Sequence, residues 1–151
     1  MKAQYINPFL VASLGLFREY LGVQCEAGEP FLNKETQRLP EVSGIIGLAG
    51  DSVGAIVLSF ERDTAIRMVS KLAGKPYPAL GNEVIDGVGE LVNIIAGNAK
   101  RDLVDYRLVI SLPGVIVGEN YKINWPQGVA VITIPFHSEL GHFSVSVSLR
   151  D

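Results

Sequence analysis

The segment "NEVIDGVGELVNIIAGNAKRD" (Asn82–Asp102) has the hydrophobic spacing of an amphipathic helix. Its apolar residues recur three and four positions apart, so they would share one arc of a helix with about 3.6 residues per turn. That arc contains Val84, Val88, Leu91, Val92, Ile95 and Ala99. Asn82 is a favourable N-cap residue, and Glu83 and Asp86 suit the positive end of the helix dipole. The pattern predicts a helix from Asn82 to about Asp102 that packs against a sheet.

The opposite arc of this helix carries little bulk near its middle. It contains Asp86, Glu90, Asn93, Gly97 and Lys100. Three glycines, Gly87, Gly89 and Gly97, interrupt the helix, and each costs up to about 1 kcal/mol relative to alanine. Such a cost is commonly retained where another backbone approaches closely. We therefore expect something to pack near these positions.

Hydrophobic periodicity elsewhere predicts two more helices and six strands. The first helix begins after Asn7, with Pro8 in the first turn where proline is tolerated, and runs to about Tyr20. The second covers 61–74 and closes at Gly74. The strand-like segments cover 23–31, 42–50, 53–60, 106–118, 128–136 and 142–149. The last of these alternates apolar residues with serines, as a half-buried strand does.

This order, α-β-β-β-α-α-β-β-β, predicts an α/β fold of the α+β type. We expect a mostly antiparallel sheet with helices packed on one face. Each half of the chain is a helix followed by three strands, a symmetry of layout and not of residues. The length of 151 residues fits one domain, and 48% hydrophobic residues are enough for a core. We expect a single domain over residues 1–151.

Composition argues against several classes of function. The net charge is −3 and no run of Lys or Arg offers a basic patch, so we expect no nucleic-acid partner. Cys25 is the only cysteine, which excludes an intrachain disulfide and a thiolate metal cluster and suits the reducing cytoplasm. No cationic neighbour in the sequence would activate Cys25 as a nucleophile. The chain shows neither a membrane span nor a signal peptide, so we expect a cytoplasmic protein.

Glu90 and Asn93 are the candidate functional pair, because residues three apart lie side by side on a helix. An asparagine side chain offers a donor and an acceptor without charge, so Asn93 could orient a water near an anion. Glu90 could pair with a lysine of whatever docks. Together they would suit attack of water on a phosphoryl group held by a partner. The same spacing also occurs on solvated helix faces that have no function.

A metal site is the alternative for this face. Asp86, Glu90 and Asn93 include no histidine, whereas carboxylate helices that hold two metals usually add Glu-x-x-His. His137 and His142 lie in the C-terminal hairpin, where we expect surface or strand-end residues and no ligands. No Gly-x-Ser-x-Gly motif predicts a hydrolase nucleophile. We expect neither a metal nor a cofactor of the chain's own.

The helix motif resembles the Glu-x-x-Asn helix of the CheC/CheX/FliY family of chemotaxis phosphatases. "DGVGELVNIIAGNAK" carries the likeness, including the trailing Gly-Asn-Ala-Lys. "INPFLVASLGLFREYLG" is similar to the family's opening helix. "LPGVIVGENYKI" and "VAVITIPFHSELGHFSVSVSL" are similar to the closing strands of CheX in particular. The resemblance covers nearly the whole chain.

The resemblance implies a phosphatase whose substrate is the aspartyl phosphate of a CheY-like response regulator. Asn93 would orient the attacking water, Glu90 would bond the receiver's lysine, and Mg²⁺ would belong to the receiver. The helix glycines would give the docking receiver clearance. Some CheC-type members carry a second Glu-x-x-Asn on the first helix, but here Glu19 has no asparagine three positions on. One site per chain, and a homodimer as in CheX, are therefore expected.

A second hypothesis is a non-catalytic binding module. CheC-like folds are also similar to the middle domain of the flagellar switch protein FliM, so the same face could dock a receiver or a motor-switch component without turnover. A docking surface alone would not require both Glu90 and Asn93. Binding of a phosphorylated receiver without hydrolysis would distinguish this hypothesis from the enzyme.

Overall fold

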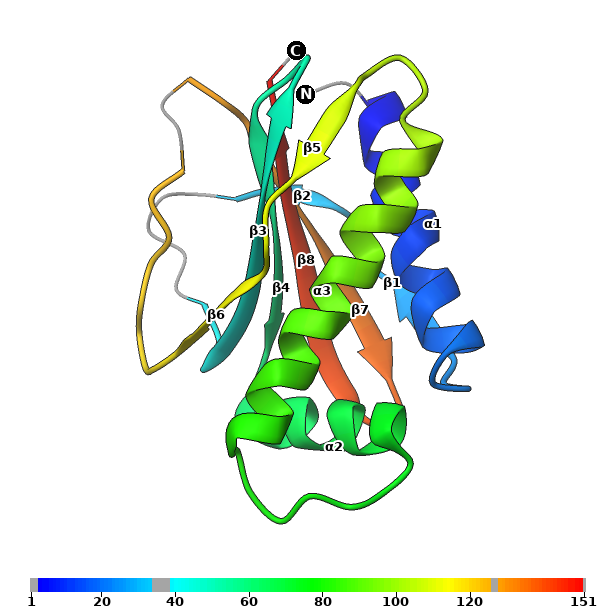
Figure 1. Cartoon of the computed structure of the whole chain (residues 1–151), viewed down its shortest axis with the longest axis vertical. Helices are drawn as coiled ribbons and strands as arrows, with labels where there is room; N and C mark the ends of the chain where they lie inside the picture. Colours follow the sequence, from blue (N-terminus) through cyan, green and yellow to red (C-terminus); the bar gives the residue numbers. More distant parts are fainter. Residues whose placement is uncertain (1–2, 34–38, 126–127, 151) are drawn as a thin grey trace.

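The computed structural model describes residues 3–33, 39–125 and 128–150 (Figure 1). Three helices and eight strands follow one another in the described residues. In chain order they are α1 (Ala3–Glu19), β1 (Cys25–Ala27), β2 (Phe31–Leu32), β3 (Val42–Gly50), β4 (Gly54–Phe60), α2 (Arg62–Ala73), α3 (Asn82–Asp102), β5 (Leu108–Ile110), β6 (Gly114–Val117), β7 (Val131–Ser138) and β8 (Gly141–Leu149). No helix in the described ranges is long and apolar enough to cross a membrane.

All strands belong to one sheet, and every strand pair in the described part of the chain is antiparallel. The order along the sheet is β1-β7-β8-β4-β3-β5, with β2 beside β7 and β6 beside β3. The helices α1 and α3 lie next to each other on one face, and α2 crosses one end of the sheet (Figure 1). The predicted fold class is confirmed.

Each outer edge of the sheet is one strand broken in two, so the structure has eight strands where six were predicted. Between the β5 pair Ile110↔Leu48 and the β6 pair Gly114↔Ile45, the edge strand has one residue more than its partner β3. The opposite edge has the same excess, where β1 and β2 pair with β7. One extra residue in one strand is a β-bulge. Pro30 and Pro113 lie in the two bulges, where a missing N–H does not interrupt the ladder.

The two halves therefore match in layout more closely than their residues suggest. Glu19 and Asp102 end the helices α1 and α3, and the first edge strand begins six positions later in each half, at Cys25 and Leu108. From the helices to the bulges, a constant offset of 83 positions relates the halves, as Glu19 and Asp102 show. The central pair β4 and β8 joins them.

The first helix starts earlier than predicted. It begins at Ala3 and contains Pro8, whereas the spacing predicted a start after Asn7. Tyr5, Ile6 and Phe9 are buried, so core packing holds the extra turn even though Pro8 removes one helical hydrogen bond.

The serine face of β8 is buried, which corrects the expectation of a half-buried strand. Ser146 is fully buried and shares a hydrogen bond of 2.8 Å with Thr133. Ser43 and Ser59 share another of 2.8 Å, and Tyr121 donates its hydroxyl to Ser43. The segment that carries Tyr121 lies on the side of the sheet away from α1 and α3 (Figure 1). Serine alternation could not reveal this, because a hydroxyl suits either water or a buried hydrogen bond.

Candidate functional site: the exposed face of helix α3

Helix α3 spans Asn82–Asp102, as the sequence predicted. Its N-cap is Gly81, without a side-chain cap, so Asn82 is the first helical residue and the expectation that it caps the helix is wrong. Glu83 in the first turn, and Lys100 and Arg101 in the last, suit the two ends of the helix dipole. Favourable charges at both ends therefore supplement the packing of the helix.

The apolar arc of α3 lies against the sheet as predicted, and all six of its residues are buried. Gly44 of β3 lets the helix come close, because a Cβ at this position would lie 3.0 Å from Val92 Cγ1 and 3.2 Å from Val88 Cγ1. A tight helix–sheet contact fixes the rotation of α3 about its axis. That rotation decides which side chains α3 presents to solvent.

Glu90 and Asn93 lie on the solvent-facing arc of α3. Glu90 is exposed and Asn93 is half-buried. Within the described part of the chain, neither side chain has a hydrogen-bond or ion-pair partner. The carboxylate and the carboxamide are therefore both available to a partner that docks on α3.

The three helix glycines have three different surroundings, which corrects the idea that all of them give a docking partner clearance. A Cβ at Gly87 would lie 2.3 Å from Val69 Cγ1, so Gly87 serves the packing of α2 on α3. Gly89 is buried, and a Cβ there would lie 3.6 Å from Pro113 Cβ. Only Gly97 faces open space, because a Cβ added there would have no atom of the described residues within 4 Å. Helical periodicity cannot separate these cases, since each depends on what lies across the helix.

The bulge between β5 and β6 flanks the candidate site, and sequence reasoning missed it. Gly47 donates its N–H to Ser111 Oγ (2.9 Å) and accepts from the Ser111 N–H (3.0 Å). The bulge turns Leu112 outward, where it is 91% exposed, and places Pro113 over Gly89. A proline inside the strand-like run "LVISLPGVIV" was the available signal, because proline within a strand marks an edge or a bulge.

The matching positions of α1 carry no such pair. At the offset of 83 positions, Asn7 stands where α3 has Glu90, and Leu10 stands where it has Asn93. Asn7 is exposed and Leu10 is half-buried, as are their counterparts. The first half thus keeps the geometry, but it has a carboxamide in place of the carboxylate and an apolar side chain in place of the carboxamide.

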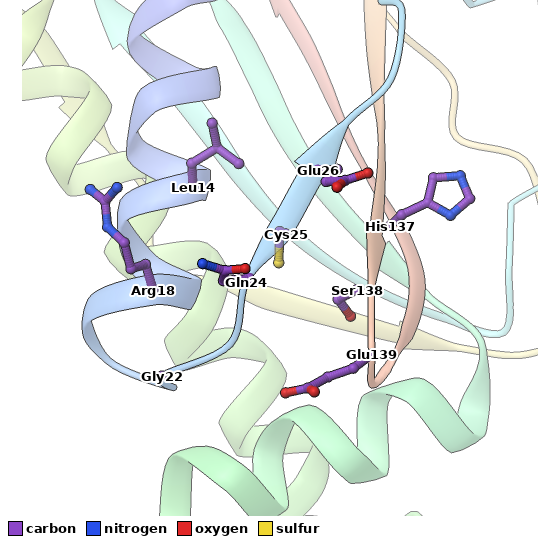
Figure 2. A pocket seen from close by; sticks show the side chains of 9 residues that line it. All are labelled: Leu14, Arg18, Gly22, Gln24, Cys25, Glu26, His137, Ser138 and Glu139. Carbon is purple, nitrogen blue, oxygen red and sulfur yellow. The ribbon is translucent and has the colours of Figure 1, made fainter.

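Cys25 lies in a different hollow, of about 610 Å³, between the end of α1, β1 and the end of β7 (Figure 2). Burial raises the pKa of the Cys25 thiol from 9.0 to about 11, so the reactive thiolate is scarce near neutral pH. Figure 2 shows His137, another residue of this hollow, pointing away from the Cys25 sulfur. This hollow therefore lacks an activated nucleophile.

His137 and His142 face each other across the β7–β8 hairpin, with ring centroids 4.1 Å apart. In the described ranges no group of three or more His, Cys, Asp or Glu side chains is placed to hold a metal ion. At the middle of its exposed face α3 offers the Glu90 carboxylate and the Asn93 carboxamide. Such a pair can orient a water and bind a cation, but it needs a partner to supply the reacting group.

Comparison with known proteins gives matches over most of the chain. The family described as Chemotaxis phosphatase CheX matches residues 42–137, a range that includes α3. The CheY-P phosphatase CheX of Thermotoga maritima is 27% identical over 126 residues, which cover 82% of this chain and 81% of that protein.

Solved structures agree over the full length. A CheC-like superfamily protein from Shewanella sp. PV-4 is 30% identical, with a TM-score of 0.91 and coverage of 100% of both chains. The CheX–CheY–BeF3–Mg²⁺ complex from Borrelia burgdorferi contains a chain 33% identical, with a TM-score of 0.82 and coverage of 97% of this chain and 98% of that one. The chain therefore belongs to the CheX family of chemotaxis phosphatases.

Proposed function

We propose that this protein accelerates hydrolysis of the aspartyl phosphate on a CheY-like receiver domain. The observation that carries the proposal is the pair Glu90 and Asn93, side by side on α3, accessible and without intrachain partners in the described residues. The chain belongs to the CheX family, and its relative from Thermotoga maritima is a CheY-P phosphatase. The Borrelia burgdorferi complex joins a similar chain to CheY, with BeF3 standing in for a phosphoryl group.

Asn93 orients the attacking water in this proposal. Its carboxamide oxygen accepts a hydrogen bond from the water, and its amide group donates to a phosphoryl oxygen. The water oxygen forms a bond to phosphorus, and the bond from phosphorus to the aspartyl oxygen breaks. The products are inorganic phosphate and a free carboxylate. An uncharged side chain suits this position because a carboxylate would repel the phosphoryl oxygens.

Glu90 pairs with the receiver's lysine. Glu90 lies three positions before Asn93 and therefore beside it on the helix, so one docked receiver can meet both side chains. The pairing fixes the register in which Asn93 enters the receiver's site. Glu90 therefore contributes to binding and orientation, which in this kind of chemistry account for most of the catalysis.

The Mg²⁺ ion of the reaction belongs to the receiver in this proposal. The Borrelia burgdorferi complex contains Mg²⁺ together with CheY and BeF3. In this proposal neither Glu90 nor Asn93 binds a metal. The chain then supplies two polar side chains and a docking surface, and α1 supplies no second pair, so each chain has one site.

A dephosphorylation assay tests the proposal. The receiver is phosphorylated with a small-molecule phosphodonor, and loss of the phosphorylated form is followed with and without the chain. The wild type should accelerate the loss, and Asn93→Ala should reduce the acceleration by at least about a hundredfold, the scale of a lost positioning group. Unchanged acceleration by Asn93→Ala would remove Asn93 from the mechanism. Binding of the phosphorylated receiver without any acceleration would instead favour the non-catalytic binding module.

A homodimer and a cytoplasmic location complete the proposal. Outer strands at both ends of the sheet expose apolar side chains: Phe31 and Leu32 on β2, Val109 on β5, and Ile116 and Val117 on β6. A second copy that pairs with one of these edges would cover the apolar side chains of that edge. Sedimentation equilibrium of the wild type, of Leu32→Lys and of Val117→Lys would identify that edge. A monomeric wild type at all concentrations would contradict the dimer.

A further inference from the structure

A basic hollow of about 560 Å³ lies at the C-terminal end of α3, next to the proposed active pair. It is lined by Gly97, Lys100 and Arg101 of α3, by Tyr106 and Arg107 before β5, and by Leu108 and Ile110 of β5. Three of these seven residues are cationic and none is acidic. Two carboxylates close by have contacts of their own: Asp51 accepts the Arg107 backbone N–H, and Asp102 lies 3.8 Å from Arg101. That last pair is exposed and contributes little.

The other half of the molecule provides an internal control for this hollow. The hollow around Cys25 in Figure 2 occupies the equivalent place, because its Leu14, Arg18 and Gln24 stand 83 positions before Gly97, Arg101 and Arg107. There Leu14 stands at the position equivalent to Gly97, and the lining includes one arginine, Arg18, and two acids, Glu26 and Glu139. Of these two hollows, only the one in the half that carries Glu90 and Asn93 has a glycine at this position and more cations than acids among its described lining residues.

The charges along the exposed face of α3 follow an order. Glu83, Asp86 and Glu90 make its first part acidic, Asn93 and Gly97 are neutral, and Lys100 and Arg101 make its end basic. Suppose that a partner places a lysine against Glu90 and a phosphoryl group against Asn93. Acidic groups of the partner would then complement the basic end of α3. A receiver that holds Mg²⁺ has carboxylates close to its phosphoryl site, since Mg²⁺ binds oxygen ligands.

The hollow lies within the footprint of a partner whose interface is centred on Asn93. A stable interface covers about 800 Å² on each partner, equivalent to a disc of about 16 Å radius. Gly97 and Lys100 follow Asn93 by four and seven positions, which is about 6 and 10 Å along the helix at about 1.5 Å per residue. A receiver docked with Asn93 at the centre of such an interface therefore also covers Gly97 and Lys100.

We propose that the hollow of Gly97, Lys100, Arg101 and Arg107 binds acidic side chains at the rim of the receiver's phosphorylation site. The inference rests on the proposed function, and it identifies the part of the docking surface that favours a receiver with acidic side chains around its phosphorylation site. The cations attract the receiver and fix its orientation, and the absence of a side chain at Gly97 leaves room for the acidic group. Complementary charges of this kind act mainly on the association rate and on orientation.

The test measures affinity without turnover, using the receiver loaded with Mg²⁺ and beryllofluoride. Isothermal titration gives Kd for the wild type, for Lys100→Gln/Arg107→Gln, and for Arg101→Gln with Arg18→Gln as its matched control at the equivalent position. At about 50 mM salt the double variant should bind about tenfold more weakly, and the difference should largely disappear at about 500 mM salt. Arg101→Gln should weaken binding, and Arg18→Gln should not.

Gly97→Leu tests the space separately from the charge. It introduces the residue that stands at the equivalent position of α1, and an added Cβ at Gly97 has no atom of the described residues within 4 Å. Leucine also favours a helix over glycine. The variant should fold at least as stably as the wild type, bind the receiver about tenfold more weakly, and keep the salt dependence of the wild type.

Three outcomes would overturn the inference. They are an unchanged Kd for the double variant at low salt, an equal effect of Arg18→Gln and Arg101→Gln, and a receiver that does not bind at all. Inorganic phosphate is titrated in parallel, and variants that lose only phosphate binding would assign the hollow to the released product. Failure of the proposed function is recognised separately, because Asn93→Ala would then dephosphorylate like the wild type whatever the charge variants do.

Discussion

Gly87 of α3 packs against Val69 of α2 so closely that residue 87 has no room for a side chain. A Cβ at this position would lie 2.3 Å from Val69 Cγ1 and 2.8 Å from Cγ2. Overpacking of this kind costs about 1–3 kcal/mol, and the gain in helix propensity is at most about 1 kcal/mol, so Gly87→Ala should destabilise the fold by up to about 2 kcal/mol. Urea unfolding followed by circular dichroism measures the change.

Gly97→Ala is the matched control for this prediction. Nothing lies within 4 Å of a Cβ at Gly97 among the described residues, so only the helix propensity changes, and stability should rise by up to about 1 kcal/mol. Val69→Ala should recover part of the loss in the Gly87→Ala background, because it shortens the side chain that clashes. A stabilising Gly87→Ala would contradict the packing of α2 on α3 described above.

Asn93→Asp tests the reason for a carboxamide at the proposed active position. The substitution keeps the shape of the side chain but adds a negative charge beside the phosphoryl group and removes the amide donor. We expect it to lose at least as much acceleration as Asn93→Ala, on the order of a hundredfold or more. The dephosphorylation assay measures the rate at saturating chain. An Asp variant that retained more activity than the Ala variant would show that shape, not charge, matters here.

Glu90→Gln should weaken docking more than it slows hydrolysis in the bound complex. Glu90 is exposed, so loss of one ion pair should raise the half-saturating concentration by about threefold to tenfold and leave the maximal rate nearly unchanged. Glu90→Lys should be worse, since it sets two cations against each other. A receiver whose lysine is replaced by glutamate should recover part of that loss, and a complete absence of coupling would exclude the proposed pair.

The order of most elements and the bounds of α3 were predictable because local periodicity determines them. The bounds Asn82–Asp102 follow from six apolar residues on one arc, and β3 over Val42–Gly50 follows from a run bounded by turn residues. The early start of α1 was not predictable, because Pro8 is a local signal that long-range burial of Tyr5 overrides. The split edges were missed although Pro113 was a local signal, because a bulge is defined by the register of the partner strand.

The candidate pair followed from the spacing of Glu90 and Asn93 together with the family resemblance, and its role remains a prediction. The environment of the pair could not be inferred. Gly87, Gly89 and Gly97 look alike in the sequence, yet they face Val69, Pro113 and open space respectively. Charge in the hollow beyond Asn93 depends on Arg107, which the chain brings back to α3 only after the turn that follows the helix.

Cys25 gives a prediction that depends on pH. Burial raises its pKa from 9.0 to about 11, so the folded protein should hold about a hundredfold less thiolate near pH 8 than the unfolded chain. Alkylation by iodoacetamide should therefore be slow at this pH and should speed up about tenfold with each pH unit. Mass spectrometry of the modified chain over time measures the rate.

The pH at which the alkylation rate of Cys25 levels off shows whether folding raises or lowers the pKa of its thiol. In the folded chain it should keep rising through about pH 10, because the thiol is still mostly protonated there, whereas in urea it should level off near the ordinary value of 9.0. The urea sample also controls for the reagent. A folded-state profile that levelled off below pH 9.0 would mean that a cation activates Cys25, and the hollow in Figure 2 would then be a candidate for reactive chemistry.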